Sequence, residues 1–121
     1  MSGRPDIRSL LAQDERILEL MGSADRIMEG NVVEKLPYSP PLVILELARG
    51  APMLEGETGV IAERWECTVG MIAEGCANEL ADRVDAAMEN LGFRHEATVG
   101  HDAGRPEWNR LVSRYSGARM R

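Results

Sequence analysis

The segment from Pro40 to Gly92 constrains the fold more than any other part of the chain. It opens with a strongly apolar run over residues 42–47, passes a glycine-rich connection and continues into an alternating stretch around Trp65. An amphipathic helical pattern follows directly. Alternation with a period of two indicates a half-buried strand, whereas a period of 3.6 indicates a helix with one apolar face. The sequence therefore predicts two strands that lead into a helix, a unit that forms a core.

The two strands of this unit differ in their pattern. Residues 42–48 are predicted to be buried on both faces, or nearly so. In residues 60–72 the apolar positions alternate with Arg64, Glu66 and Thr68, which predicts one core face and one wet face. The connection over residues 49–59 is too long for a tight hairpin and is expected to be a loop that exposes Met53 and Leu54. Such loops often contact partners, although ordinary packing is the alternative.

The remaining elements complete the predicted order. Helices are expected near residues 7–11 and 14–21, with Asp14 as an N-cap and Gly22 as a stop, and a short strand is expected near residues 26–28. An irregular proline-rich loop follows over residues 37–41. A helix over 74–91 and strands over 93–99 and 108–116 come next. The order α-α-β-β-α-β-β predicts an α+β fold with one antiparallel or mixed sheet of about four strands, covered by helices.

Length and composition favour one domain. The chain has 121 residues, of which 44% are hydrophobic, so one core over residues 1–121 is expected, with flexible ends at 1–5 and 117–121. The net charge of −6 argues against a protein that binds nucleic acid by neutralising phosphates. Because no apolar run reaches the length of a membrane span and no signal-peptide pattern is visible, a cytoplasmic origin without a membrane partner is expected.

Charge is unevenly distributed along the chain. Residues 105–121 hold five arginines and one acid, whereas the residues before them hold nine bases and nineteen acids, a formal charge of −10. The simpler interpretation is a solvated, arginine-rich strand and chain end. The alternative is head-to-tail association, in which a basic edge that includes Arg110 and Arg114 meets an acidic face of the next copy.

Residues with catalytic or ligand-binding chemistry do not form a recognisable motif. His95, His101 and Asp102 lack the spacing of a metal site, and structural or solvent roles are expected for them. Acid pairs such as Glu63 with Glu66, or Glu55 with Glu57, lie at positions predicted to be wet. Cys67 falls on the predicted core face, and both cysteines are expected to be free buried thiols. The glycines at 56 and 59 lack the lysine of a phosphate-binding loop. The sequence therefore predicts no catalytic residue, no cofactor and no metal ligand.

The order of elements, taken with several local patterns, resembles a known family. These patterns are a helical start (Ile7 to Met21), a proline-rich approach to a strong strand (Pro37-Tyr38-Ser39-Pro40-Pro41-Leu42-Val43-Ile44), a strand with an aromatic residue (Arg64-Trp65-Glu66-Cys67-Thr68-Val69), a helix closed by Leu91-Gly92-Phe93, and a last strand ending Arg110-Leu111-Val112-Ser113-Arg114-Tyr115. Over nearly its whole length the chain is similar to the small tail-completion or tail-terminator proteins of long-tailed bacteriophages. It departs from their pattern in the short connection over 100–106 and in its more basic end.

The resemblance implies a structural virion protein that is not an enzyme. Members of the family form a ring, usually of six subunits, on the end of the tail tube. The ring stops tube polymerisation and presents the surface to which the head connector attaches. Partners would be other copies, the major tail tube protein and the head-tail connector protein, with DNA passing through the ring unbound, and the protein would reside in the host cytoplasm until it joins the virion tail or neck.

Two alternatives to the tail-terminator ring stay open at this point. One is a neck or head-closure adaptor of the virion. The other, from a different class, is a small cytoplasmic α+β enzyme or ligand-binding domain whose site forms between subunits, for which His95 or His101 would need a perturbed pKa. For a ring or an adaptor, the expected contact residues are Tyr38, Met53, Leu54, Arg110 and Arg114, with ordinary surface or core packing as the alternative for each.

Overall fold

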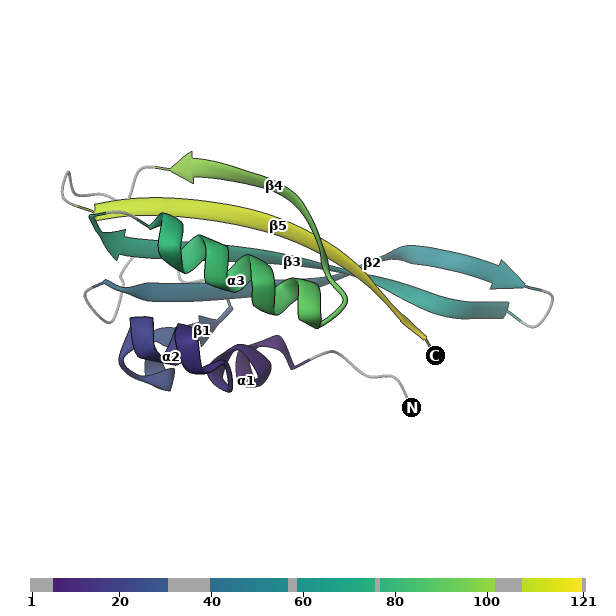
Figure 1. The fold of residues 1–121 in the computed structure, drawn as a ribbon. Coiled ribbons are helices and arrows are strands. Elements are labelled where there is room, and N and C mark those ends of the chain that lie inside the picture. Colours follow the sequence, from purple (N-terminus) through teal and green to yellow (C-terminus); the bar gives the residue numbers. More distant parts are fainter. Residues whose placement is uncertain (1–5, 31–39, 57–58, 76, 102–107, 121) are drawn as a thin grey trace.

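The structure is a computed structural model that describes residues 6–30, 40–56, 59–75, 77–101 and 108–120. The side chains of residues 49–56, 59–63, 101 and 118–120 lie outside that description. The described elements are α1 (Ile7–Ala12), α2 (Glu15–Met21), the short 3-10 helix η1 (Ala24–Arg26), β1 (Ile27–Glu29), β2 (Leu42–Gly56), β3 (Gly59–Glu74), α3 (Asn78–Asn90), β4 (Arg94–His101) and β5 (Trp108–Met120) (Figure 1).

The strands form one mixed sheet in the order β1-β2-β3-β5-β4. Strand β1 runs parallel to β2, and every other neighbouring pair is antiparallel. The predicted α+β class with a single sheet is confirmed. The short strand expected near residues 26–28 is β1, which adds a fifth strand to the four that were expected. Strand β5 continues beyond its expected end, to Met120. Mobility of the two chain ends stays a prediction.

The prediction of a loop over residues 49–59 is wrong. Strand β2 runs to Gly56, which pairs with Gly59 at the start of β3, so the two strands form a long hairpin. Figure 1 shows this two-stranded arm reaching beyond the rest of the sheet. The register shifts three times, between Arg49 and Pro52, between Pro52 and Leu54, and between Leu54 and Glu55. Such irregularities break the period of two, and proline is tolerated in an edge strand, which explains why the segment looked like a loop.

The expectation that residues 42–48 are buried on both faces holds only for the first part of the strand. Leu42, Val43 and Leu45 are buried, but Glu46 and Ala48 are exposed. The helices cover only one face of the sheet, so Glu46 and Ala48, which lie on the other face, reach solvent. The strand is therefore half-buried beyond Leu45.

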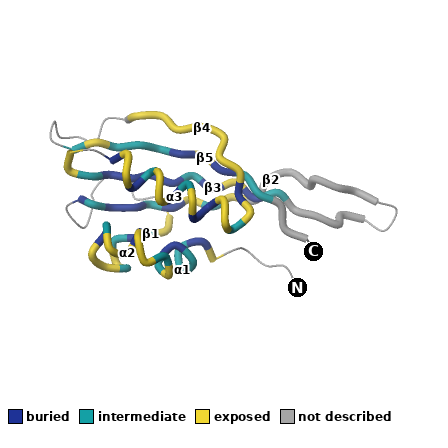
Figure 2. Tube along the Cα trace, viewed as in Figure 1, coloured by how far each residue is buried: buried dark blue, intermediate teal, exposed yellow. Residues whose placement is uncertain are grey.

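The core lies between the sheet and the three α-helices. Their buried residues belong to one cluster with the odd-numbered residues of β2 and β3, so all three helices cover the same face (Figures 1 and 2). The predicted helix stripe is confirmed where the structure describes it, although the helix begins at Asn78 and not at residue 74. The predicted wet face of β3 is also confirmed. The core members shared by these elements are Ile7, Leu11, Ile17, Met21, Val43, Leu45, Trp65, Cys67, Val69, Met71, Leu80, Val84, Ala87 and Met88.

Both predicted caps of α2 are present. The Asp14 carboxylate accepts hydrogen bonds from the backbone N–H groups of Arg16 and Ile17 at the start of α2. Gly22 ends α2 with φ of 82°, a left-handed conformation that favours glycine. None of the described helices is long and apolar enough to cross a membrane.

Candidate assembly surface

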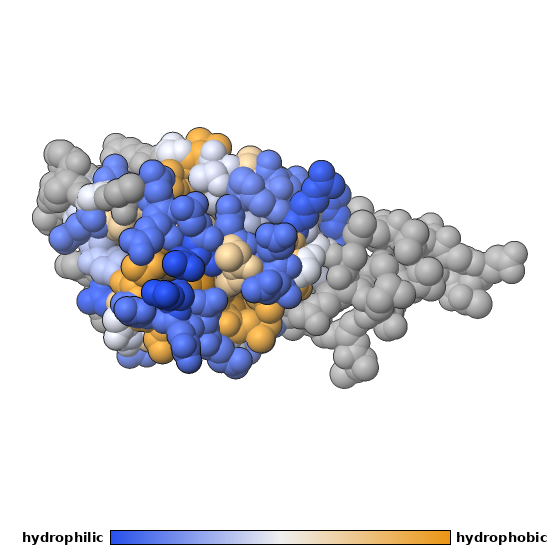
Figure 3. Space-filling view, in the orientation of Figure 1, coloured by the Kyte–Doolittle hydropathy of each residue, from blue (hydrophilic) through white to orange (hydrophobic). Residues whose placement is uncertain are grey.

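The face of the sheet opposite the helices carries a mixed set of polar and charged side chains. Figure 3 views the other side of the molecule, where hydrophilic side chains predominate over the helices between smaller apolar patches. On the helix-free face the strand register brings together Thr68 of β3, Arg114 of β5 and Ala97 of β4 in one row. Arg114 and Ala97 are exposed. The row beside it holds Glu66 and Ser116.

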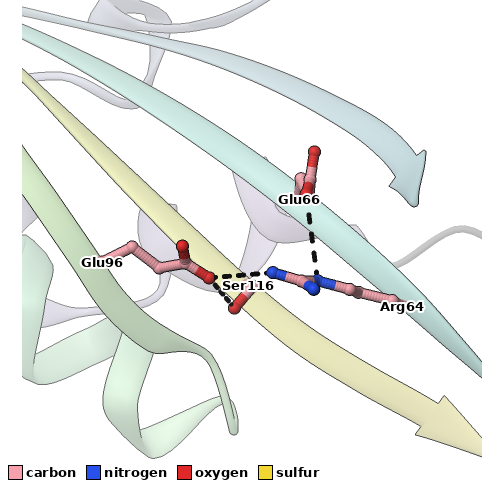
Figure 4. A network of polar contacts seen from close by, with 4 residues as sticks. All are labelled: Arg64, Glu66, Glu96 and Ser116. Carbon is pink, nitrogen blue, oxygen red and sulfur yellow. Dashed lines mark hydrogen bonds and ion pairs between the residues drawn. The ribbon is translucent and has the colours of Figure 1, made fainter. Parts of the chain in front are cut away.

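A polar network ties three strands together on this face (Figure 4). The guanidinium of Arg64 on β3 lies 3.0 Å from a carboxylate oxygen of Glu96 on β4, and its Nε lies 3.8 Å from Glu66. The Ser116 hydroxyl on β5 donates a hydrogen bond to the same oxygen of Glu96. This hydrogen bond, with the nearby positive charges of Arg64 and Arg114, holds the pKa of Glu96 below its ordinary value.

Glu96 reaches this network because β4 is irregular at that point. His95 pairs with Tyr115 and Ala97 pairs with Arg114, so the register shifts between them and Glu96 is the extra residue. A bulge of this kind redirects one side chain and increases local twist. The pattern of the sequence marked Arg64 and Glu66 as wet, but it did not identify Glu96 or Ser116, because their proximity depends on the strand order β3-β5-β4.

A second polar cluster lies on the helix-covered side of β4 and β5. Tyr115 is buried, and its hydroxyl donates to a carboxylate oxygen of Asp85 on α3. Burial raises the pKa of Tyr115 above its ordinary value, and the bond to Asp85 raises it further, so the phenol stays protonated. His95 Nε2 lies 2.6 Å from the Thr98 hydroxyl, which lies 2.7 Å from the buried Ser113 hydroxyl. These contacts join α3, β4 and β5.

The ring of His95 also lies against that of Tyr115, with the ring centroids 5.4 Å apart. The structure therefore gives His95 packing and hydrogen-bond contacts of a structural kind. The described residues contain no group of three or more His, Cys, Asp and Glu side chains close enough to hold a metal ion. Cys67 is buried, as predicted, and forms no disulfide within the described residues, whereas Cys76 and Asp102 lie outside them.

The five predicted contact residues fall in different places. Arg110 and Arg114 lie on β5, four residues apart and thus on the same helix-free face. Arg110 is half-buried, with its Nε buried and without a hydrogen-bond partner among the described residues, whereas Arg114 is exposed. Met53 and Leu54 lie in the arm, where the structure describes the backbone only. Tyr38 lies outside the described residues.

Comparison with solved structures shows a likeness in fold. The chain is similar in structure to a chain of the virion of a native gene transfer agent particle, with a TM-score of 0.62 over 93% of this chain and 90% of that chain. The two sequences are 13% identical, so the likeness shows a shared fold. No protein-family description and no curated protein sequence matches the chain.

Proposed function

We propose that this chain is a structural component of a phage-like virion. The observation that carries the proposal is the likeness to a chain of the gene transfer agent virion, which extends over 93% of this chain and leaves only 10% of the matched chain unaligned. Whole-chain agreement of that kind relates complete domains and not a shared motif.

Within the virion, we propose that the protein forms the terminator ring at the end of the tail tube. Six copies would stop tube polymerisation and join the tail to the head connector, without enzymatic activity. A sheet with free edges is a liability in a monomer, and a closed ring of copies in head-to-tail contact would cover those edges. The net charge of −6 is compatible with a lumen through which DNA passes without binding.

A neck or head-closure adaptor is the second candidate. The likeness is to a chain of the virion and indicates no position within it, so it supports a protein at the neck as well as one at the tail end. The two candidates differ in their partner, since a terminator binds the end of a tail tube and an adaptor binds the head connector.

The test combines self-assembly with partner binding. Light scattering behind size exclusion, over a range of concentrations, measures the mass of the assembly, and negative-stain images show whether large species have a central hole. The protein is then mixed with purified tail tubes and, separately, with tail-less heads of the same particle. Extra density at the ends of the tubes supports the terminator function, and binding to heads alone supports the adaptor function. A strict monomer that binds neither contradicts both.

A further inference from the structure

Two strands keep an unpaired outer edge within the described residues. Strand β4 closes one end of the sheet, and Arg94 to Gly100 are all exposed (Figure 2). At the other end β1 pairs only with Val43–Leu45, and the Gly30 N–H donates to the Leu45 carbonyl at 2.8 Å. Beyond that bond, β2 has no outer neighbour in the part of the chain that the structure describes. An unpaired edge of this kind exposes backbone N–H and C=O groups that can pair with another strand.

The short strand β1 does not offer an equivalent open edge. Arg8 of α1 donates from Nε to the Ile27 carbonyl at 2.8 Å and from Nη2 to the Ala24 carbonyl at 3.2 Å. The guanidinium therefore satisfies backbone acceptors at the start of β1. Among the described residues, the open part of this end of the sheet begins at Glu46.

Strand direction makes the two open edges compatible with each other. Since β2 is antiparallel to β3, β3 to β5 and β5 to β4, strands β2 and β4 run in opposite directions. When a second copy is placed beside the first with its helices on the same side, its β2 runs antiparallel to the first copy's β4. Antiparallel neighbours form the more stable ladder per residue. The sheet can therefore continue from one copy to the next.

The regular parts of both edges are short and accessible. After the bulge at Glu96, strand β4 is regular from Ala97 to His101, and β2 is regular from Glu46 to Arg49 before its register shifts. Val99 lies in the first of these stretches and is 55% exposed, and the exposed Ala48 lies in the second. A β-branched apolar residue exposed on an edge strand favours strand addition, because natural edges are usually guarded by charge or proline.

We propose that copies of this chain join head to tail by antiparallel pairing of β4, around Val99, with the stretch of β2 around Ala48 in the next copy. The contact uses different surfaces of the two copies, so the same step can repeat and close into a ring. This inference rests on the proposed ring and names the contact between its subunits. The bulge at Glu96 and Pro52 in the arm limit the pairing to the short regular stretches.

The test uses one variant for each edge and a matched control. Val99→Lys places a charge on the β4 edge, and Ala48→Lys does the same on β2. Leu18→Lys is the control, because Leu18 is also a large exposed apolar residue, 37% exposed, but lies on helix α2 and not on a strand. Circular dichroism checks that each variant is folded. Light scattering then measures the concentration at which half of the chains are assembled.

We expect each edge variant to raise that concentration about tenfold or more, as edge lysines oppose strand pairing, while Leu18→Lys behaves like the wild type. Mixing the two edge variants is expected to give a complex of two chains, twice the 13.4 kDa of one, because each retains the edge that the other lacks. If Val99→Lys assembles like the wild type, or if the mixture forms no two-chain complex, the proposed contact is wrong and the proposed ring is unaffected. A wild type that stays monomeric alone and on tail tubes overturns both.

Discussion

Arg64 and Glu96 lie on strands that are not neighbours, yet their side chains meet at 3.0 Å across β5. The contact forms because the bulge in β4 redirects Glu96 toward β3 and because Ser116 on the intervening strand holds the same carboxylate oxygen. The edge strand β4 is thereby joined by side chains to the centre of the sheet. Both side chains are 39% exposed, so solvent and salt reach the pair.

A double-mutant cycle on this pair should show coupling. We expect Arg64→Ala and Glu96→Ala to destabilise the protein by less in combination than the sum of their separate effects, since either change alone breaks the same ion pair. The coupling should shrink in 1 M salt, because screening is strong at exposed sites. Urea unfolding at low and high salt measures it. Additive effects at both salt concentrations would show that the contact contributes nothing.

The pH dependence of stability should reflect the ionisation of Glu96. Its pKa is lowered in the folded state, so the folded protein holds the ionised form better than the unfolded chain does. That contribution is complete above the unfolded pKa of a glutamate and is lost as the pH falls through the lower, folded pKa. Comparing wild type with Glu96→Gln in urea from pH 7 to pH 3 isolates it. We expect the difference in stability to narrow with acidification; a constant difference would contradict the assignment.

Tyr115→Phe should destabilise the protein by about 1 kcal/mol. The change removes the donor to Asp85 and leaves that carboxylate without its partner from β5, at the usual cost of a lost hydrogen bond. Tyr115→Ala, which also opens a cavity in the core, should cost about 3–5 kcal/mol. Thermal and urea unfolding measure both. A phenylalanine variant as stable as the wild type would mean that the hydroxyl bond makes no net contribution.

Two glycines should respond in opposite ways to alanine. Gly22 has φ of 82°, where a side chain is strained, so Gly22→Ala should destabilise by about 1 kcal/mol even though no atom lies within 4 Å of the new Cβ. Gly100 lies in β4 with similarly open space and no left-handed backbone, so Gly100→Ala should be neutral or stabilise by a few tenths of a kcal/mol. Equal losses at both positions would show that the backbone conformation does not control the effect.

Several parts of the fold follow from local pattern alone. The stripe from Leu80 to Met88, the caps at Asp14 and Gly22, and the alternation around Cys67 each predicted an element that the structure contains. Periodicity succeeds here because one apolar face must be buried, whatever the element packs against. The arm was missed because Pro52 and the register shifts around it remove the period on which such a prediction depends.

The candidate surface also combines features that the sequence predicts with features that only the tertiary structure decides. Residue spacing predicts the order and class of the elements and the exposed side of β3, since each depends on neighbours only a few positions apart. The contact of Arg64 with Glu96, the bond from Tyr115 to Asp85 and the outer position of β4 with its exposed Val99 depend on strand order and on one bulge. Those features join residues that are far apart along the chain, and local periodicity carries no information about which strands become neighbours.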